Sequence, residues 1–288
     1  MPRRTSYEVR IAGQFGAVRQ LDRFSDELVH RRRLPVHIDL AGVTFMRPLA
    51  VVGLVLFLEA MLARGREIHI TLPGRPGVLN YLVAIGLPEI MNLLGTWSWP
   101  EDFPKEATKG LRPMVKLSRF STADDVDRLS EQMADVFSSD SLLPTTLGPA
   151  CHSVFSELAD NVLIHADAGG YVLAQRFEYQ VGPIIDITIG DLGIGVRKSL
   201  WRNAALRASL ADDSSALRMA MTDGVTSIVG DRYRGYGLGQ VRAELSALGR
   251  RLVVRSGTAV GTWKEGRAIS IYECGVSKGT LVHAMVPC

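Results

Sequence analysis

The hydrophobic pattern of this chain changes at residues 95–105, and that break constrains the fold more than any other feature of the sequence. Two tryptophans and two prolines fall in this stretch and interrupt every helical or strand periodicity. The chain has 288 residues, whereas a single domain favours roughly 150 residues. We therefore expect one domain over 1–95, a linker over 96–114 and a second domain over 115–288.

Before the break, short segments with the alternating period of strands are interleaved with segments that have the longer period of helices. The expected strands cover 7–12, 36–40 and 67–72. The expected helices cover 16–31, 48–64 and parts of 78–94. This alternation predicts a compact α/β domain.

After the break, long helical patterns come first and several strands follow, which is typical of an α+β domain. The expected strands cover 115–120, 171–179, 183–190, 251–256, 268–273 and 280–286. The expected helices cover 124–138, 147–165, 197–210, 214–222 and 237–248. We expect a two-layer α/β sandwich, in which helices cover a mixed, mostly antiparallel sheet.

Composition excludes several classes of protein. A hydrophobic fraction of 47% beside 22% charged residues is too apolar for a disordered chain. The net charge of +3 gives no reason to expect nucleic-acid binding. The longest apolar run, 49–58, is about half of the roughly 20 residues that a membrane helix needs. Because the basic N-terminal residues precede no apolar stretch, we expect no secretory signal and a cytoplasmic location.

The expected helix 147–165 carries three polar residues at intervals of four, Glu157, Asn161 and His165, which place them on one face. An apolar stripe runs beside them, so Glu157 would lie at the edge of a core, where desolvation favours a role as a base. Asn161 offers a neutral oxygen of the kind that Mg²⁺ accepts. The alternative is a surface helix on which all three polar residues are solvated.

Two glycine-rich segments follow. The first, Asp-Leu-Gly-Ile-Gly at 191–195, comes directly after an alternating strand; a carboxylate there can accept a hydrogen bond from an exocyclic amine such as that of adenine. The second, Gly-Tyr-Gly-Leu-Gly at 235–239, precedes a helix, whose N-terminus favours phosphate oxygens. Each segment alone is also compatible with an ordinary turn.

Four features, taken in order, resemble the GHKL ATPases: Glu157 and Asn161 on the expected helix, the two glycine-rich segments and a late Gly-Thr pair at 279–280. This family, also called histidine kinase-like or Bergerat-fold ATPases, includes DNA gyrase, histidine kinases and the serine kinases that act as anti-sigma factors. The resemblance covers 115–288.

The resemblance implies ATP and Mg²⁺ as cofactors. It implies Glu157 as the base or water-orienting carboxylate, Asn161 as the magnesium ligand and Asp191 as the residue that reads adenine. It further implies an ATP lid over 216–235. The other implied nucleotide-binding residues are Gly193, Gly195, Gly235, Gly237, Leu238, Gly239 and Thr280.

Other nucleotide-binding and kinase classes fit less well. Neither glycine segment has the GxGxxG spacing of a dinucleotide site, and neither has the lysine followed by serine or threonine of a P-loop. A histidine kinase would need a dimerising helix pair with a phosphoacceptor histidine upstream, where this chain has an α/β pattern. His152 precedes Glu157 too closely on the same helix to be that acceptor.

The segment 36–45 and the apolar helix after it resemble the STAS domain, the fold of anti-sigma factor antagonists, over roughly residues 5–95. In phosphorylated members Asp-Ser-Ser-Gly opens the helix, whereas residues 46–49 here are Met-Arg-Pro-Leu. Because the phosphoacceptor serine is absent, we expect this domain to dock a regulatory partner protein or to hold the ATPase in a homodimer. The alternative is a purely structural α/β appendage.

The sequence therefore predicts a bacterial regulatory signalling protein in which Mg-ATP binding changes how a partner is engaged. The expected chemistry is slow hydrolysis of ATP or phosphoryl transfer to a serine or threonine of another protein. The alternative function is a non-catalytic ATP-binding scaffold. We expect neither nucleic acid nor a membrane as a direct partner.

Overall fold

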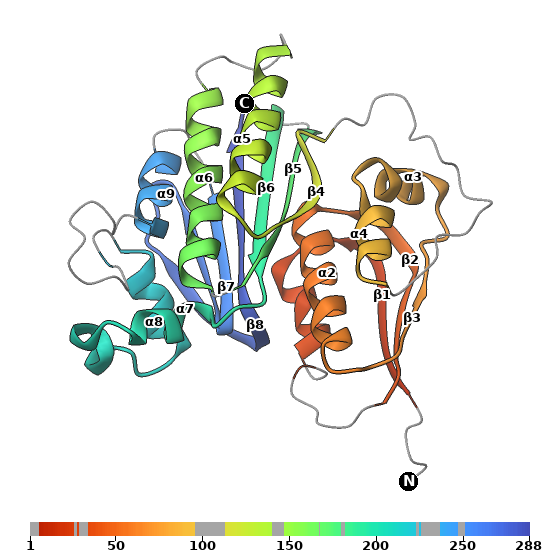
Figure 1. Ribbon diagram of the computed structural model, residues 1–288, viewed down its shortest axis with the longest axis horizontal. Coiled ribbons are helices and arrows are strands. Elements are labelled where there is room, and N and C mark those ends of the chain that lie inside the picture. The colour runs from red at the N-terminus through yellow and green to blue at the C-terminus, as the bar shows by residue number, and fades with distance from the viewer. Residues whose placement is uncertain are drawn as a thin grey trace.

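The computed structural model describes residues 6–25, 28, 34–95, 113–139, 147–166, 168–179, 182–222, 225, 237–246 and 251–288. Within these residues the chain is mixed α/β and contains two separate sheets, one parallel and one antiparallel (Figure 1). Most of the predicted linker at 96–114 lies outside the described residues, so the division of the chain into domains stays a prediction.

The N-terminal sheet has three parallel strands in the order β1-β2-β3. Its strands are β1 (Tyr7–Phe15), β2 (Val36–Met46) and β3 (Ile68–Thr71). The helices of this half are the 3-10 helix η1 (Val18–Phe24), α2 (Pro48–Leu62), α3 (Pro76–Ala84) and α4 (Leu87–Leu93). Proline opens α2 and α3 and follows the first residue of α4, where its missing N–H leaves no helical hydrogen bond unmade.

The C-terminal sheet has five strands in the order β4-β5-β6-β8-β7, and every neighbouring pair is antiparallel. Its strands are β4 (Val115–Phe120), β5 (Gly170–Tyr179), β6 (Gly182–Asp191), β7 (Arg251–Lys264) and β8 (Ser270–Pro287). Its helices are α5 (Ala123–Ser139), α6 (Leu147–His165), α7 (Gly195–Trp201), the 3-10 helix η2 (Ala204–Ser209), α8 (Asp213–Ala220) and α9 (Gly237–Ser246). Helices α5, α6 and α9 cover one face of this sheet (Figure 1).

Four element predictions need correction. The strands expected at 268–273 and 280–286 are one strand, β8, and β7 continues well beyond residue 256. The two long strands accommodate irregularities as register shifts: Gly257 has a φ of +59° and lies at such a shift in β7. In addition, the described part of the helix expected at 16–31 is mainly the 3-10 helix η1, and 197–210 divides into α7 and η2.

Helix α2 lies between the two sheets, so the layers run sheet, helix, sheet, helix (Figure 1). All of its residues except Glu59 and Leu62 are buried, as expected for a helix that is apolar on every side. Its side chains fit against glycine in β6: a Cβ added at Gly190 would lie 2.7 Å from Leu56 Cδ1. Buried residues of both halves, such as Leu58 and Leu281, therefore belong to one hydrophobic cluster.

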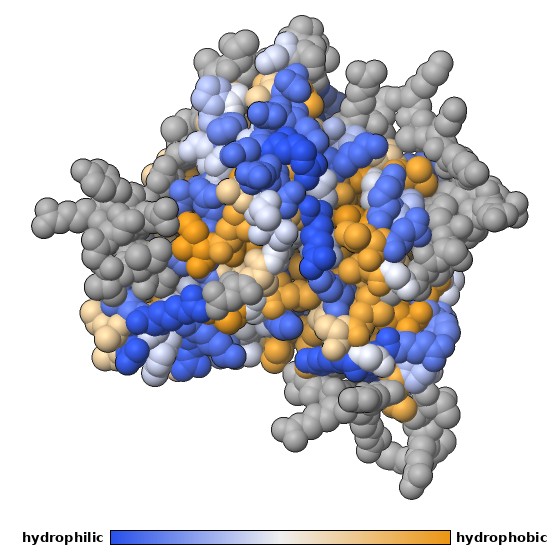
Figure 2. All heavy atoms as spheres, in the orientation of Figure 1, coloured by the Kyte–Doolittle hydropathy of each residue, from blue (hydrophilic) through white to orange (hydrophobic). Residues whose placement is uncertain are grey.

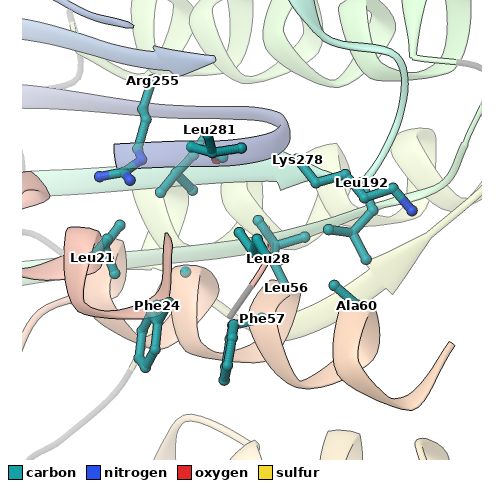
Figure 3. Close-up of a pocket in the computed structure, with 13 residues that line it drawn as sticks. Leu21, Phe24, Leu28, Leu56, Phe57, Ala60, Leu192, Arg255, Lys278 and Leu281 are labelled. Carbon is teal, nitrogen blue, oxygen red and sulfur yellow. The ribbon is translucent and has the colours of Figure 1, made fainter. Parts of the chain in front are cut away.

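A buried arginine also joins the two halves. Arg255 of β7 is 2% exposed and pairs with Asp22 of η1, with 2.7 Å between Nη1 and Oδ1. The same guanidinium donates to the carbonyl oxygens of Val18 at 3.0 Å and Gly275 at 2.9 Å. A small pocket beside it is lined from both halves, by Phe24 and Phe57 as well as by Arg255 (Figure 3).

The surface is unevenly apolar on the face drawn in Figure 2. Hydrophilic residues gather over α5, whereas apolar residues gather over α2 and α4. Leu93 at the end of α4 is 61% exposed. No helix in the described part of the chain combines the length and the apolar character needed to cross a membrane.

Candidate functional site

Asp191, the predicted adenine reader, is the last residue of β6 and is only 3% exposed. Its Oδ1 accepts a hydrogen bond of 2.7 Å from the backbone N–H of Gly193, and the carboxylate accepts a second from the N–H of Thr280. Burial outweighs these two bonds and raises the pKa of Asp191 to about 6. This carboxylate is held in a fixed position and carries a charge that is expensive to bury.

The turn after Asp191 requires its glycines. A Cβ at Gly193 would lie 2.0 Å from the carbonyl oxygen of Ala166, and Gly195 has a φ of +77°. The same carbonyl of Ala166 accepts a hydrogen bond of 3.1 Å from the N–H of Ile194. Because Ala166 directly follows α6, the turn is fixed to the end of the helix that carries the polar box.

Thr280 reaches Asp191 through the pairing of β6 with β8. The register matches Gly190 with Leu281, so Asp191 and Thr280 come level at the end of the two strands. Gly279 before it has a φ of +69°, and a Cβ there would lie 2.0 Å from the carbonyl oxygen of Asp191. The segments 191–195 and 279–280, which are far apart in the sequence, therefore meet at the carboxylate of Asp191.

Sequence reasoning missed Ser256, which ties these segments together. Its hydroxyl donates to the carbonyl of Gly279 at 2.9 Å and accepts from the N–H of Val196 at 3.0 Å. Its oxygen is also 3.4 Å from the hydroxyl of Thr280. The sequence offered only a serine at the expected end of a strand, which is too common a feature to single out.

On α6, Glu157, Asn161 and His165 are half-buried, while Val154 and Leu158 of the adjacent stripe are fully buried, as the periodicity predicts. The side-chain N–H₂ of Asn161 donates 2.7 Å to the carbonyl oxygen of Glu157 one turn earlier. That bond fixes the amide and leaves its oxygen as the atom with which Asn161 would meet a cation.

The second glycine-rich segment, 235–239, is described only in part. Gly237, Leu238 and Gly239 form the first turn of α9, and α9 packs against α6. Gly235 lies outside the described residues, as does most of the predicted lid at 216–235; its first residues belong to α8. In the described residues, α6 thus packs against α9, and the residue after its C-terminal end holds the turn that follows Asp191.

A cavity of about 670 Å³ borders the turn. Gly193, Gly195, Ser256 and Gly279 contribute to its lining together with cationic side chains, whereas Glu157 and Asn161 do not. Asn161 can offer Mg²⁺ one side-chain oxygen, and the described residues hold no group of three or more His, Cys, Asp or Glu that could bind a metal ion. One protein oxygen fits an ion that keeps its water and phosphate ligands, but not a resident structural metal.

No protein-family model matches this chain, and no curated protein sequence matches it either.

Proposed function

We propose that this chain is an ATP-binding regulatory protein with a GHKL-type ATPase domain of the Bergerat fold preceded by a STAS-like domain. The observation that carries the proposal is the carboxylate of Asp191. It is almost fully buried, has a raised pKa and is held by the backbone N–H groups of Gly193 and Thr280 at the end of β6. A buried, oriented carboxylate beside a glycine turn suits recognition of a ring amine better than it suits a structural role.

The roles that the family resemblance implies would be divided among residues of β6, β8, α6 and α9. Asp191 would accept a hydrogen bond from the amine of adenine, with Thr280 beside it, and Gly193 and Gly195, which line the neighbouring cavity, would line the nucleotide. The first turn of α9 would face the phosphates. Asn161 would hold the Mg²⁺ ion, which when bound supplies charge neutralisation on the phosphate oxygens.

Glu157 lies one helical turn before Asn161 and is the candidate base. It would orient a water molecule, or a serine or threonine hydroxyl of a partner protein, toward the terminal phosphorus. The new bond forms between that oxygen and phosphorus, the bond to the bridging oxygen of ADP breaks, and the nucleophile's proton passes to the carboxylate of Glu157.

Titration calorimetry with Mg-ATP tests the site. We expect wild type to bind and Asp191→Ala to bind at least about tenfold more weakly, because a charge-assisted hydrogen bond is lost. The matched control is Asp127→Ala, which removes an exposed aspartate of α5 and should leave binding unchanged. The absence of binding by wild type, or undiminished binding by Asp191→Ala, would refute the assignment.

An assay of ADP formation separates an ATPase or kinase from a non-catalytic ATP-binding scaffold, because hydrolysis and phosphoryl transfer both produce ADP. We expect Glu157→Ala to bind Mg-ATP like wild type but to form ADP at least about a hundredfold more slowly, since it lacks the base. The assay is run with and without candidate partner proteins. Equal rates from the two proteins under both conditions would favour the scaffold.

A further inference from the structure

The opposite face of the five-stranded sheet carries a second polar site. Along β6, Ile185, Ile187 and Ile189 belong to the cluster under α6, so the residues between them, Asp186 and Thr188, point to the face that the N-terminal half covers. Both are fully buried. Polar residues in the middle of a buried sheet face are costly unless they have a partner or a use.

A cavity of about 610 Å³ opens on this face, between the loop after β1 and the strands β7 and β8. Three arginines contribute to its wall: Arg19, Arg47 and Arg251. Among the described residues that line the cavity, the only ionisable ones besides these arginines are Tyr272 and His283, and none of them carries a carboxylate. Its size lies within the range of about 300–1,000 Å³ that is typical of small-molecule sites.

Two of the arginines, Arg19 and Arg47, are placed by contacts with their neighbours. Arg19 stacks over the ring of Tyr272, 4.7 Å from its centre. Arg47 crosses Gly16, where an added Cβ would lie 2.7 Å from the arginine side chain, and its Nη1 lies 4.0 Å from the sulfur of Met285. A guanidinium that is held in this way loses little freedom when it binds a ligand.

His283 forms the buried end of the cavity. It is 3% exposed, and its Nε2 has no hydrogen-bonding partner among the described residues. The nearest charged atom is Oδ2 of Asp186, 3.5 Å away, and neither carboxylate oxygen of Asp186 has a hydrogen-bonding partner within the described part of the chain. Thr188, paired with His283 across the strands, likewise has a buried hydroxyl without such a partner.

We propose that this cavity binds a small organic phosphate. Arginine forks suit the oxygens of a phosphate, and a doubly charged phosphate group matches three arginines in the wall better than a singly charged carboxylate does. The apolar wall formed by Phe45, Leu49 and Val253 suits the organic part of the ligand. This site lies on the opposite face of the sheet from α6, and the inference does not rest on ATP binding.

Phenyl phosphate is the probe, and titration calorimetry in EDTA, without nucleotide, is the measurement. We expect wild type to bind it in the submillimolar range and Arg47→Met/Arg251→Met to bind at least about tenfold more weakly. The control pair Arg75→Met/Arg267→Met removes two exposed arginines outside the cavity and should bind like wild type. Benzoate, which carries a carboxylate in place of the phosphate, should bind at least about tenfold more weakly than phenyl phosphate.

A second measurement locates the ligand independently of the arginine variants. The imidazole NMR signals of His283, assigned with His283→Gln, should shift on addition of phenyl phosphate, and Asp191→Asn should leave both this shift and the affinity unchanged. The proposal is overturned if wild type does not bind, if the arginine variant binds equally well, or if His283 does not respond. Tighter binding of benzoate would overturn the phosphate assignment, and loss of binding in Asp191→Asn would move the ligand to the first site.

Discussion

At the scale of single residues, the protonation of Asp191 should be visible in the stability of the protein. Its pKa rises from 3.8 to about 6 on folding because the side chain is buried. A carboxyl group with a raised pKa favours the folded state while it is protonated, so its contribution is fully present below about pH 4 and is lost as the pH rises to about 6. The difference between the two pKa values corresponds to about 3 kcal/mol in the free energy of unfolding.

Asp191→Asn cannot ionise but keeps an oxygen that accepts from Gly193. We therefore expect the free energy of unfolding of wild type, measured relative to this variant, to fall by up to about 3 kcal/mol between pH 4 and pH 7. Denaturant unfolding of both proteins at several pH values measures the difference. A constant difference over that range would mean that Asp191 is not the buried acid described here.

Gly193 tests how tightly the turn is built. Gly193→Ala should destabilise the protein by about 1–3 kcal/mol or more, because the new methyl group would meet the carbonyl of Ala166 rather than a flexible side chain. The control is Gly77→Ala in α3, where no atom lies within 4 Å of an added Cβ. That variant should be neutral or more stable by up to about 1 kcal/mol. Similar midpoints of urea unfolding for the two variants would contradict the close approach.

At the scale of elements, the sequence predicted most of what local patterns determine. The bounds of β4 and α6 agree with the expected 115–120 and 147–165, because strand alternation and a long apolar stripe are local signals. The length of β8 was not predictable in this way, since its glycines lie at register shifts that only the partner strand β7 defines. The meeting of Asp191 with Thr280 likewise depends on strand register. The role of Ser256 depends on the contact between β7 and β8, which the sequence does not reveal.

Helix α2 is the element whose role sequence reasoning underestimated. Its apolar run is too short for a membrane helix, but the sequence did not show that both sheets would bury it. Leu58, which is fully buried, should cost about 2–5 kcal/mol when changed to alanine. Leu93→Ala in the exposed end of α4 should change stability by no more than about 0.5 kcal/mol. Equal effects of the two substitutions in thermal unfolding would show that α2 does not occupy the core.

At the scale of the whole molecule, the N-terminal half contacts the candidate nucleotide site directly. Leu192, inside the turn after Asp191, points toward Ala60 of α2 (Figure 3). Leu192 also packs against the hydrophobic cluster that α2 shares with β8. If nucleotide binding changed the turn, the contacts of Leu192 would therefore transmit that change to the N-terminal half without any movement of a linker. This is a physical route by which the nucleotide state would alter partner binding.

The shared core also predicts that the two halves open together. Arg255→Met removes the guanidinium that holds Asp22, Val18 and Gly275, and we expect a loss of about 3 kcal/mol, since a buried ion pair loses one partner. Hydrogen exchange followed by mass spectrometry should show peptides of α2 and of β6 losing protection by the same amount. Arg119→Met, which breaks the exposed pair with Glu59, should cost no more than about 1 kcal/mol. Loss of protection in α2 alone would mean that the halves are separate cooperative units, and their common core would then contribute little to the stability of the sheet.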